Sequence, residues 1–253
     1  MLVADFPGRY RAVAYAVRLV VILPFGYYVG LMRVATAIRV LEKAYGTPKR
    51  SELDDPLECL IRTVLSQNTN DVNRDRAYEA MRNRFPTWEA VIGAPTRKLA
   101  DAIRVGGIAN VKSRRIQRIL CHVKDRSRDF DLRFLRDRSP EETEAVLGGL
   151  DGVGPKTVKC VQIFALGQPA FPVDTHIFRL SKRMGFIGEK ATRDEAHAVM
   201  GHLVPPEKMY SFHLNLIEHG RRVCRAPRAL CSGCPLAKRC PKIGVRDEQK
   251  ETA

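Results

Sequence analysis

The sequence shows no convincing alternation of apolar and polar residues and no internal repeat. Half-buried strands produce that alternation, so its absence argues against a sheet-based fold. Apolar residues instead recur at helical spacing, and a polar break after residue 65 places Asn70 or Asp71 as the cap of a helix running to Phe85. Further helices are predicted over 34–45, 56–65, 88–92, 96–103, 112–124, 131–136 and 141–150. The predicted fold class is all-α.

The sequence also lacks an apolar run long enough for an ordinary membrane span. The best candidate, Leu19–Met32, is short and is interrupted by Pro24 and Gly26. No small-residue cleavage site of the A-x-A kind follows it. We therefore expect residues 1–32 to be an extension outside the folded domain, with Met32 as a candidate initiator, and we expect no membrane partner.

Acidic residues are in the minority. The chain of 253 residues has 43 Lys and Arg against 28 Asp and Glu, a formal net charge of +15 spread along its length. Such a surface suits a polyanion, with nucleic acid as the first candidate and an anionic membrane as the second. The length allows one large domain or two modest ones.

Paired C-x2-C motifs, which zinc sites favour, are scarce as well. Three of the seven cysteines, Cys59, Cys121 and Cys160, stand in apolar helical contexts and are interpreted as small buried hydrophobes. The other four are spaced C-x6-C-x2-C-x5-C, with a single C-x2-C pair, at Cys224, Cys231, Cys234 and Cys240. Four thiolates so close together can hold zinc or a [4Fe-4S] cluster. The odd total and the tight cluster favour a reducing compartment over a disulfide framework.

The most informative stretch is LDGVGPKTVKCVQIFALGQPAFPVDTHIFR, residues 150–179. Gly152 and Gly154 frame a tight turn, and Pro155 suits the first position of the helix that follows. Backbone N–H groups at such a helix start favour an anion such as phosphate. Lys156 lies in the first turn of that helix, where its amine can act as a nucleophile or as a phosphate contact. Asp174, just before a helical run, is a good N-cap.

These motifs, in this order, resemble the helix-hairpin-helix DNA glycosylases of the endonuclease III type. The resemblance covers roughly residues 35–241 and rests on LDGVGPKT, on FPVDTHIFR and on the four C-terminal cysteines with their 6-2-5 spacing. It implies two helical domains with a DNA cleft between them. One domain is a bundle over 51–166 with the hairpin, the other combines 33–50 with 167–242 and carries the cluster, and 243–253 forms a tail.

The resemblance also implies roles for particular residues. Lys156 would attack C1′ of a flipped nucleotide, expel the base and allow β-elimination, while Asp174 would stabilise the cationic sugar. In the Ser66–Asp71 loop, Asn68 aligns best with the wedge that fills the emptied space, and Gln67 is the neighbouring candidate. Gly152 and Gly154 would contact the DNA backbone. The four cysteines would hold a [4Fe-4S] cluster, and the basic residues around them, including Arg225 and Arg228, would contact phosphates.

Other side chains are given no site role. His176, His213 and His219 are interpreted as packing or hydrogen-bonding residues. The basic run Lys112–Arg115 is interpreted as a solvated helix face and is left out of the site.

The function implied is base-excision repair by an enzyme with DNA N-glycosylase and abasic-site lyase activities, acting as a monomer on double-stranded DNA that contains damaged bases, oxidised pyrimidines first, or abasic sites. The expected location is cytoplasmic, on the nucleoid. An adenine-mismatch enzyme is disfavoured, because Thr63 stands near the place of that branch's catalytic glutamate and Lys156 is present. A thymine/uracil mismatch or methylcytosine glycosylase remains an alternative, as does a non-catalytic iron-sulfur DNA-binding protein. A pure binding module, however, needs neither Lys156 nor Asp174.

Overall fold

Regular structure in the chain is almost entirely helical. The structure is a computed structural model that describes residues 21–22, 28–29, 32–127 and 129–245. Its strands, β1 (Val21–Ile22) and β2 (Tyr28–Val29), form a two-residue antiparallel pair. The predicted all-α class is confirmed. Most of the predicted extension lies outside the described residues, but Met32 at its end is buried.

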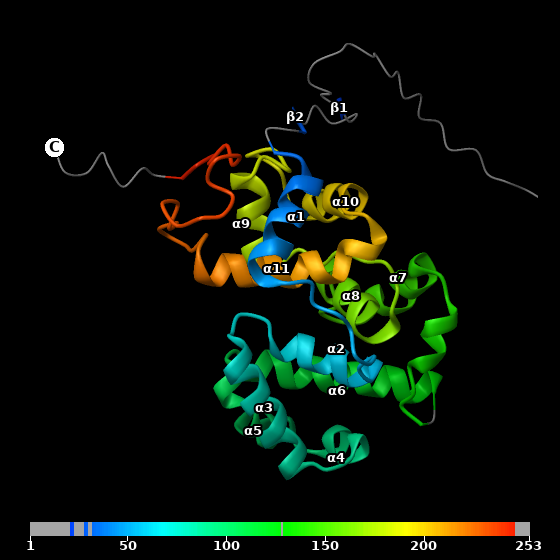
Figure 1. The fold of residues 1–253 in the computed structure, drawn as a ribbon. Coiled ribbons are helices and arrows are strands. Elements are labelled where there is room, and N and C mark those ends of the chain that lie inside the picture. Colours follow the sequence, from blue (N-terminus) through cyan, green and yellow to red (C-terminus); the bar gives the residue numbers. More distant parts are fainter. Residues whose placement is uncertain (1–20, 23–27, 30–31, 128, 246–253) are drawn as a thin grey trace, which may run out of the picture.

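A first lobe contains the central part of the chain (Figure 1). Its apolar core draws on residues from Leu57 to Leu166. Its elements are α2 (Pro56–Leu65), α3 (Asp71–Arg84), α4 (Trp88–Gly93), α5 (Thr96–Ala102), η1 (Arg104–Gly106), α6 (Ala109–Arg126), η2 (Arg133–Asp137), α7 (Pro140–Gly148), α8 (Pro155–Val161) and the π-helical η3 (Gln162–Leu166).

A second lobe combines α1 (Val34–Tyr45) with the C-terminal part of the chain (Figure 1). Its other elements are α9 (Thr175–Arg183), α10 (Arg193–Leu203), η4 (Pro206–Lys208) and α11 (Met209–Arg222). A separate apolar core joins the residues from Met32 to Leu41 with those from Ile163 to Leu236. The phenol of Tyr45 at the end of α1 hydrogen-bonds Nδ1 of His219 in α11 at 2.8 Å. The second core includes Ile163, which falls within the region 51–166 predicted for the first domain, and the predicted domain boundaries stay a prediction.

Short polar side chains begin the helices that matter for the site. Asn70 accepts a hydrogen bond from the Asn73 N–H at 2.8 Å and so starts α3. Asp174 caps α9 through the Ile177 N–H at 2.7 Å. Ser139 and Thr192 start α7 and α10 in the same way, each within a capping box. Each cap satisfies a backbone donor that the helix itself leaves unpaired, so the ends that face the site have defined positions.

The hairpin helix α8 connects the two cores. Val158 and Val161 belong to the first core, whereas Ile163, in the η3 continuation, belongs to the second. A π-helical turn changes which side chains face each side, and such turns occur frequently at functional sites. Within the described residues, no helix has the length and apolar character needed to cross a membrane.

Candidate active site

A tight turn joins α7 to α8 and places Gly152 against Arg115 of α6. Gly152 has a φ of 74°, in the left-handed region that favours glycine. A Cβ atom built on it would lie 2.4 Å from Nε of Arg115. Gly154 has a φ of −94° and would place its Cβ in open space. Both glycines line the same cavity. Only at Gly152 do the backbone conformation and the contact with Arg115 require glycine.

We expect Gly152→Ala to cost about 1–2 kcal/mol of folding free energy, because an L-residue in the left-handed region is strained by that amount. The new methyl group would also displace Arg115 and break its 3.0 Å hydrogen bond to Gln67, which should weaken DNA binding. Gly154→Ala is the matched control and should be tolerated. Thermal unfolding and binding to an abasic duplex measure both effects. Similar results for the two variants would contradict this account.

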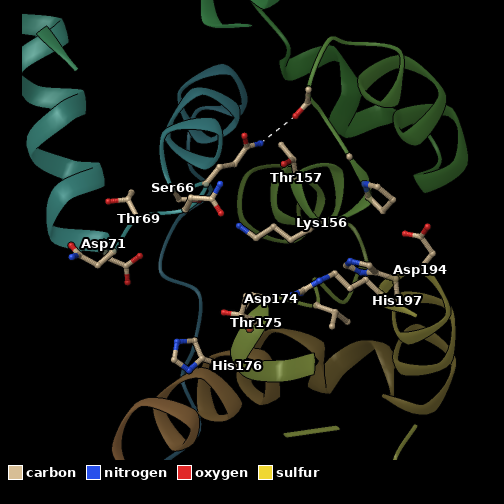
Figure 2. A pocket seen from close by; sticks show the side chains of 18 of the residues that line it. Ser66, Thr69, Asp71, Lys156, Thr157, Asp174, Thr175, His176, Asp194 and His197 are labelled. Carbon is tan, nitrogen blue, oxygen red and sulfur yellow. Dashed lines mark hydrogen bonds between the residues drawn. The ribbon is translucent and has the colours of Figure 1, made fainter. Parts of the chain in front are cut away.

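Lys156 and Asp174 line one cavity of about 1030 Å³ between the lobes. Lys156 projects from the first turn of α8 between the loop that carries Ser66 and Thr69 and the start of α9 (Figure 2). Both candidate catalytic side chains are half-buried. The thiol of Cys160, one turn along α8, is buried, and this burial raises its pKa while Lys156 opposes the shift. The structure therefore brings together the amine and the carboxylate that were predicted separately.

Two histidines, His176 and His213, lie near Lys156 and Asp174. Nδ1 of the buried His213 lies 3.1 Å from the Pro172 carbonyl oxygen, and burial lowers the pKa of His213 to about 4 against the opposing effect of Asp174. This histidine is therefore neutral near pH 7. His176 faces the cavity from α9, and its Nδ1 lies 3.2 Å from Nη2 of Arg179. Neither arrangement requires these side chains to transfer protons.

The Ser66–Asp71 loop forms the opposite wall of the cavity. Gln67 is already bound within the protein, since its amide donates to the Gly152 carbonyl at 3.2 Å and accepts from Arg115 at 3.0 Å. Asn68 has a φ of 53°, in the left-handed region. The loop therefore offers Asn68 to a ligand more readily than Gln67. The wedge role itself stays a prediction.

The interpretation of Lys112–Arg115 as a solvated face is wrong for part of this run. Lys112 and Ser113 are fully buried, and Arg115 contacts Gln67 and Gly152. Helical spacing contained the missing signal, because Lys112 lies four and seven residues before the buried Ile116 and Ile119.

Ile108 is a further residue that the sequence did not single out. It stands between η1 and α6 with a φ of 40°, which is unusual for a β-branched residue, and the residue is 46% exposed. The preceding Gly107 lies close to the loop, because a Cβ built on it would be 3.8 Å from the Asn68 carbonyl oxygen. An exposed apolar tip therefore lies beside the candidate wedge.

The second lobe completes the cavity wall. Asp194 and His197 of α10 face it (Figure 2). His197 is buried, with 6% of the residue exposed, and this burial lowers its pKa. Across the mouth, Arg221 of α11 forms an ion pair with Asp71 of α3. The cavity is thus lined by both lobes and is linked at its rim by a pair of opposite charges.

The four C-terminal cysteines line a second, small cavity, which Arg183 of α9 and His219 of α11 also line. Among the described residues, no group of three or more His, Cys, Asp or Glu side chains is gathered closely enough to hold a metal ion as it stands. Polar groups surround the sulfurs: Nη1 of Arg183 donates to Sγ of Cys224 at 3.4 Å, and Nε2 of His219 lies 3.6 Å from Sγ of Cys234. A donor set of four thiols with such neighbours fits an iron-sulfur cluster. Arg225 and Arg228 are exposed beside it.

A family comparison decides the assignment. The family model described as "HhH-GPD superfamily base excision DNA repair protein" matches residues 61–206, which include the hairpin and Asp174. The chain belongs to this superfamily. It is a base-excision-repair DNA glycosylase of the endonuclease III type, as the resemblance of its motifs predicted.

Individual relatives agree with this assignment. The glycosylase is 34% identical to a putative DNA glycosylase of Arabidopsis thaliana over 79% of this chain and 70% of that protein. It is 32% identical to endonuclease III of Thermotoga maritima over 76% of this chain and 86% of that protein. A solved non-covalent endonuclease III–DNA complex and a trapped endonuclease III–DNA covalent intermediate each superpose with a TM-score of 0.71 at 28% identity, covering 83% of this chain and 94% of theirs. The fold of this chain follows from these likenesses, and both of these solved neighbours are complexes with DNA.

Proposed function

We propose that the glycosylase is bifunctional: it removes damaged bases, with oxidised pyrimidines as the first candidates, and then cleaves the abasic site through a Schiff base on Lys156. The observation that carries the proposal is the placement of Lys156 and Asp174 in one cavity between the lobes. The trapped covalent intermediate of a solved endonuclease III supports it, because that relative bonds covalently to DNA.

In the first step, the Lys156 amine attacks C1′ of the flipped nucleotide and the C1′–N bond to the base breaks. The departing base carries away the electron pair of that bond and gains a proton. Positive charge develops on the sugar as this bond weakens, and the carboxylate of Asp174 stabilises it. Sugar ring opening leaves a Schiff base between Lys156 and C1′.

In the second step, the Schiff base acidifies the proton on C2′. Its removal to a base, and departure of the 3′ phosphate with the electrons of the C3′–O bond, complete β-elimination. Water then hydrolyses the Schiff base and frees Lys156. The cavity lies between the lobes, so a flipped nucleotide that enters it is separated from the duplex stack.

DNA would be held mainly through its backbone. The turn around Gly152 and Gly154 faces the cavity and offers backbone N–H groups to phosphate. Exposed Arg225 and Arg228 extend the basic surface on the second lobe. Such contacts give affinity that falls with added salt and carries no base sequence information.

We also infer that Cys224, Cys231, Cys234 and Cys240 hold a [4Fe-4S] cluster. When bound, the cluster would serve as a structural crosslink. The chain's own residues surround this place: Nη1 of Arg183 donates to Sγ of Cys224, and Nε2 of His219 lies 3.6 Å from Sγ of Cys234. Leu236 belongs to the apolar core against which Cys224, Cys234 and Cys240 pack. The segment from Val223 to Val245, which contains no helix or strand, would thereby gain a fixed shape next to its basic residues.

Borohydride trapping tests the lyase proposal. The purified protein is mixed with a duplex containing one abasic site and reduced, and the adduct is digested and mapped by mass spectrometry. We expect a covalent adduct on the peptide that contains Lys156. Tight DNA binding without an adduct would reject the Schiff base. The protein would then be a glycosylase that only hydrolyses the bond between the base and the sugar.

A further inference from the structure

Lys112 is a buried lysine with no place in the chemistry above. It is fully buried, and its Nζ donates to two backbone carbonyls, those of Leu65 and Gly106, each at 2.6 Å. Burial lowers the pKa of Lys112 to about 8. A buried ammonium that is held only by carbonyl dipoles is costly, so it needs a reason to be kept. Its depth excludes direct contact with DNA.

The two carbonyls belong to two different turns at the edge of the active-site cavity. Leu65 ends α2 and leads into the loop with Asn68. Gly106 ends η1 and leads into Ile108. Asn68 and Ile108 both adopt left-handed backbone conformations, with φ values of 53° and 40°. Such conformations are unfavourable for residues other than glycine and persist only where the surroundings enforce them.

The two turns are packed closely against each other and against helix α3. A Cβ built on Gly106 would lie 3.1 Å from Cβ of Ala77 in α3, and one built on Gly107 would lie 3.8 Å from the Asn68 carbonyl oxygen. Helix α3 therefore packs against the Gly106 turn, while Lys112 holds the same turn through its hydrogen bond to the Gly106 carbonyl. Gly107, which directly precedes Ile108, therefore lies close to Asn68.

We propose that Lys112 is a positioning residue for DNA opening, which holds these two turns as one rigid edge so that Asn68 and Ile108 enter the duplex together. The proposal rests on the proposed function, because only an enzyme that flips a nucleotide needs such an edge. Unstacking a base costs free energy, and a mobile edge would spend part of the free energy of its DNA contacts on its own ordering.

Comparison of two substrates separates positioning from general stability. The first is a duplex with one abasic site, which must be opened, and the second is a single strand with the same site, which needs no opening. For Lys112→Met, we expect single-turnover cleavage of the duplex to slow by about tenfold or more, the size expected for losing hydrogen bonds to a charged group. Cleavage of the single strand should change by less than about twofold.

Two further variants complete the design. Lys124→Met removes an exposed lysine from the same helix and should behave as the wild type. Lys112→Arg keeps the charge and the donors and should recover most of the duplex rate. Equal losses on both substrates for Lys112→Met would reduce the residue to a general structural role, and an unchanged duplex rate would reject any positioning role.

Two measurements do not depend on turnover. Amide hydrogen exchange over residues 66–70 and 106–110 should be faster in Lys112→Met, and 2-aminopurine placed opposite the abasic site should report less opening. Unchanged values would overturn the proposal. If Lys112→Met does not fold, Lys112→Gln, a neutral side chain with two donors, is compared in the same way. A wild type that opens DNA but cleaves neither substrate would refute the lyase function and leave the role of Lys112 intact.

Discussion

Lys156→Gln is expected to abolish both the borohydride adduct and strand cleavage, with the cleavage rate falling by at least about 10³-fold, as for removal of a covalent nucleophile. Glutamine is nearly as long as lysine and remains polar, but its amide nitrogen cannot form a Schiff base. Because Lys156 is half-buried in the cavity wall and lies outside both apolar cores, the fold should be unaffected. Gel-based assays of trapping and strand cleavage on an abasic duplex measure the effect.

Lys159→Gln is the matched control. Lys159 lies on the same helix, three residues further on, and its Nζ is 3.8 Å from a Glu144 carboxylate oxygen. The substitution removes the same charge from α8 but leaves the cavity unchanged, so trapping and cleavage should stay near wild type. An adduct that persisted in Lys156→Gln would show that a different amine attacks the sugar.

Asp174→Asn is expected to slow base release by about 10²–10³-fold, the range for removing one transition-state-stabilising group from an active site. The same change should barely affect stability, since asparagine caps a helix as well as aspartate does. Its side-chain oxygen can still accept the 2.7 Å hydrogen bond from the Ile177 N–H. The substitution thus removes the charge and keeps the cap. Single-turnover base release and thermal unfolding separate the two contributions.

Asp55→Asn provides the matched control for that experiment. Asp55 caps α2 through the Glu58 N–H at 2.9 Å, away from the cavity. It should therefore leave both rate and stability unchanged. Asp174→Ala should lose the cap as well as the charge and add about 1 kcal/mol of destabilisation. Wild-type base release by Asp174→Asn would mean that Asp174 is only a cap.

Local patterns predicted much of this molecule because helices such as α1 and α9 have a distinct apolar face, and most of the helices carry clear end signals. The predicted ranges 34–45 and 56–65 coincide with α1 and α2. Spacing could not reveal that the helix predicted over 112–124 begins at Ala109, because its start depends on the left-handed conformation of Ile108. That conformation is imposed by tertiary contacts and has no sequence signal of its own.

In the candidate site, too, residues in local motifs could be predicted, whereas residues placed by tertiary contacts could not. Lys156 and Asp174 stand in motifs that resemble those of a known family, and this resemblance allowed catalytic roles to be proposed for both from the sequence. The burial of Lys112 could have been predicted from its helical spacing to Ile116 and Ile119. Its two hydrogen-bond partners, Leu65 and Gly106, could not, because they approach it only through folding. The α10 wall with Asp194 and His197 was missed for the same reason, since nothing near those residues indicates that they face a cavity built largely by other segments.

The pairing of α1 with α11 also governs the order in which the protein can be completed during synthesis. Tyr45 and His219 are 174 positions apart, and Glu42 bonds Lys208 across 166. At a synthesis rate of about 5–20 residues per second, roughly 10–35 s pass between the synthesis of α1 and that of its partner helix. The first lobe draws on a continuous stretch of chain and can form during that interval. Arg221, at the mouth of the cavity, belongs to the late-made helix α11, so a nascent chain can complete the wall of this cavity only after α11 has been synthesised.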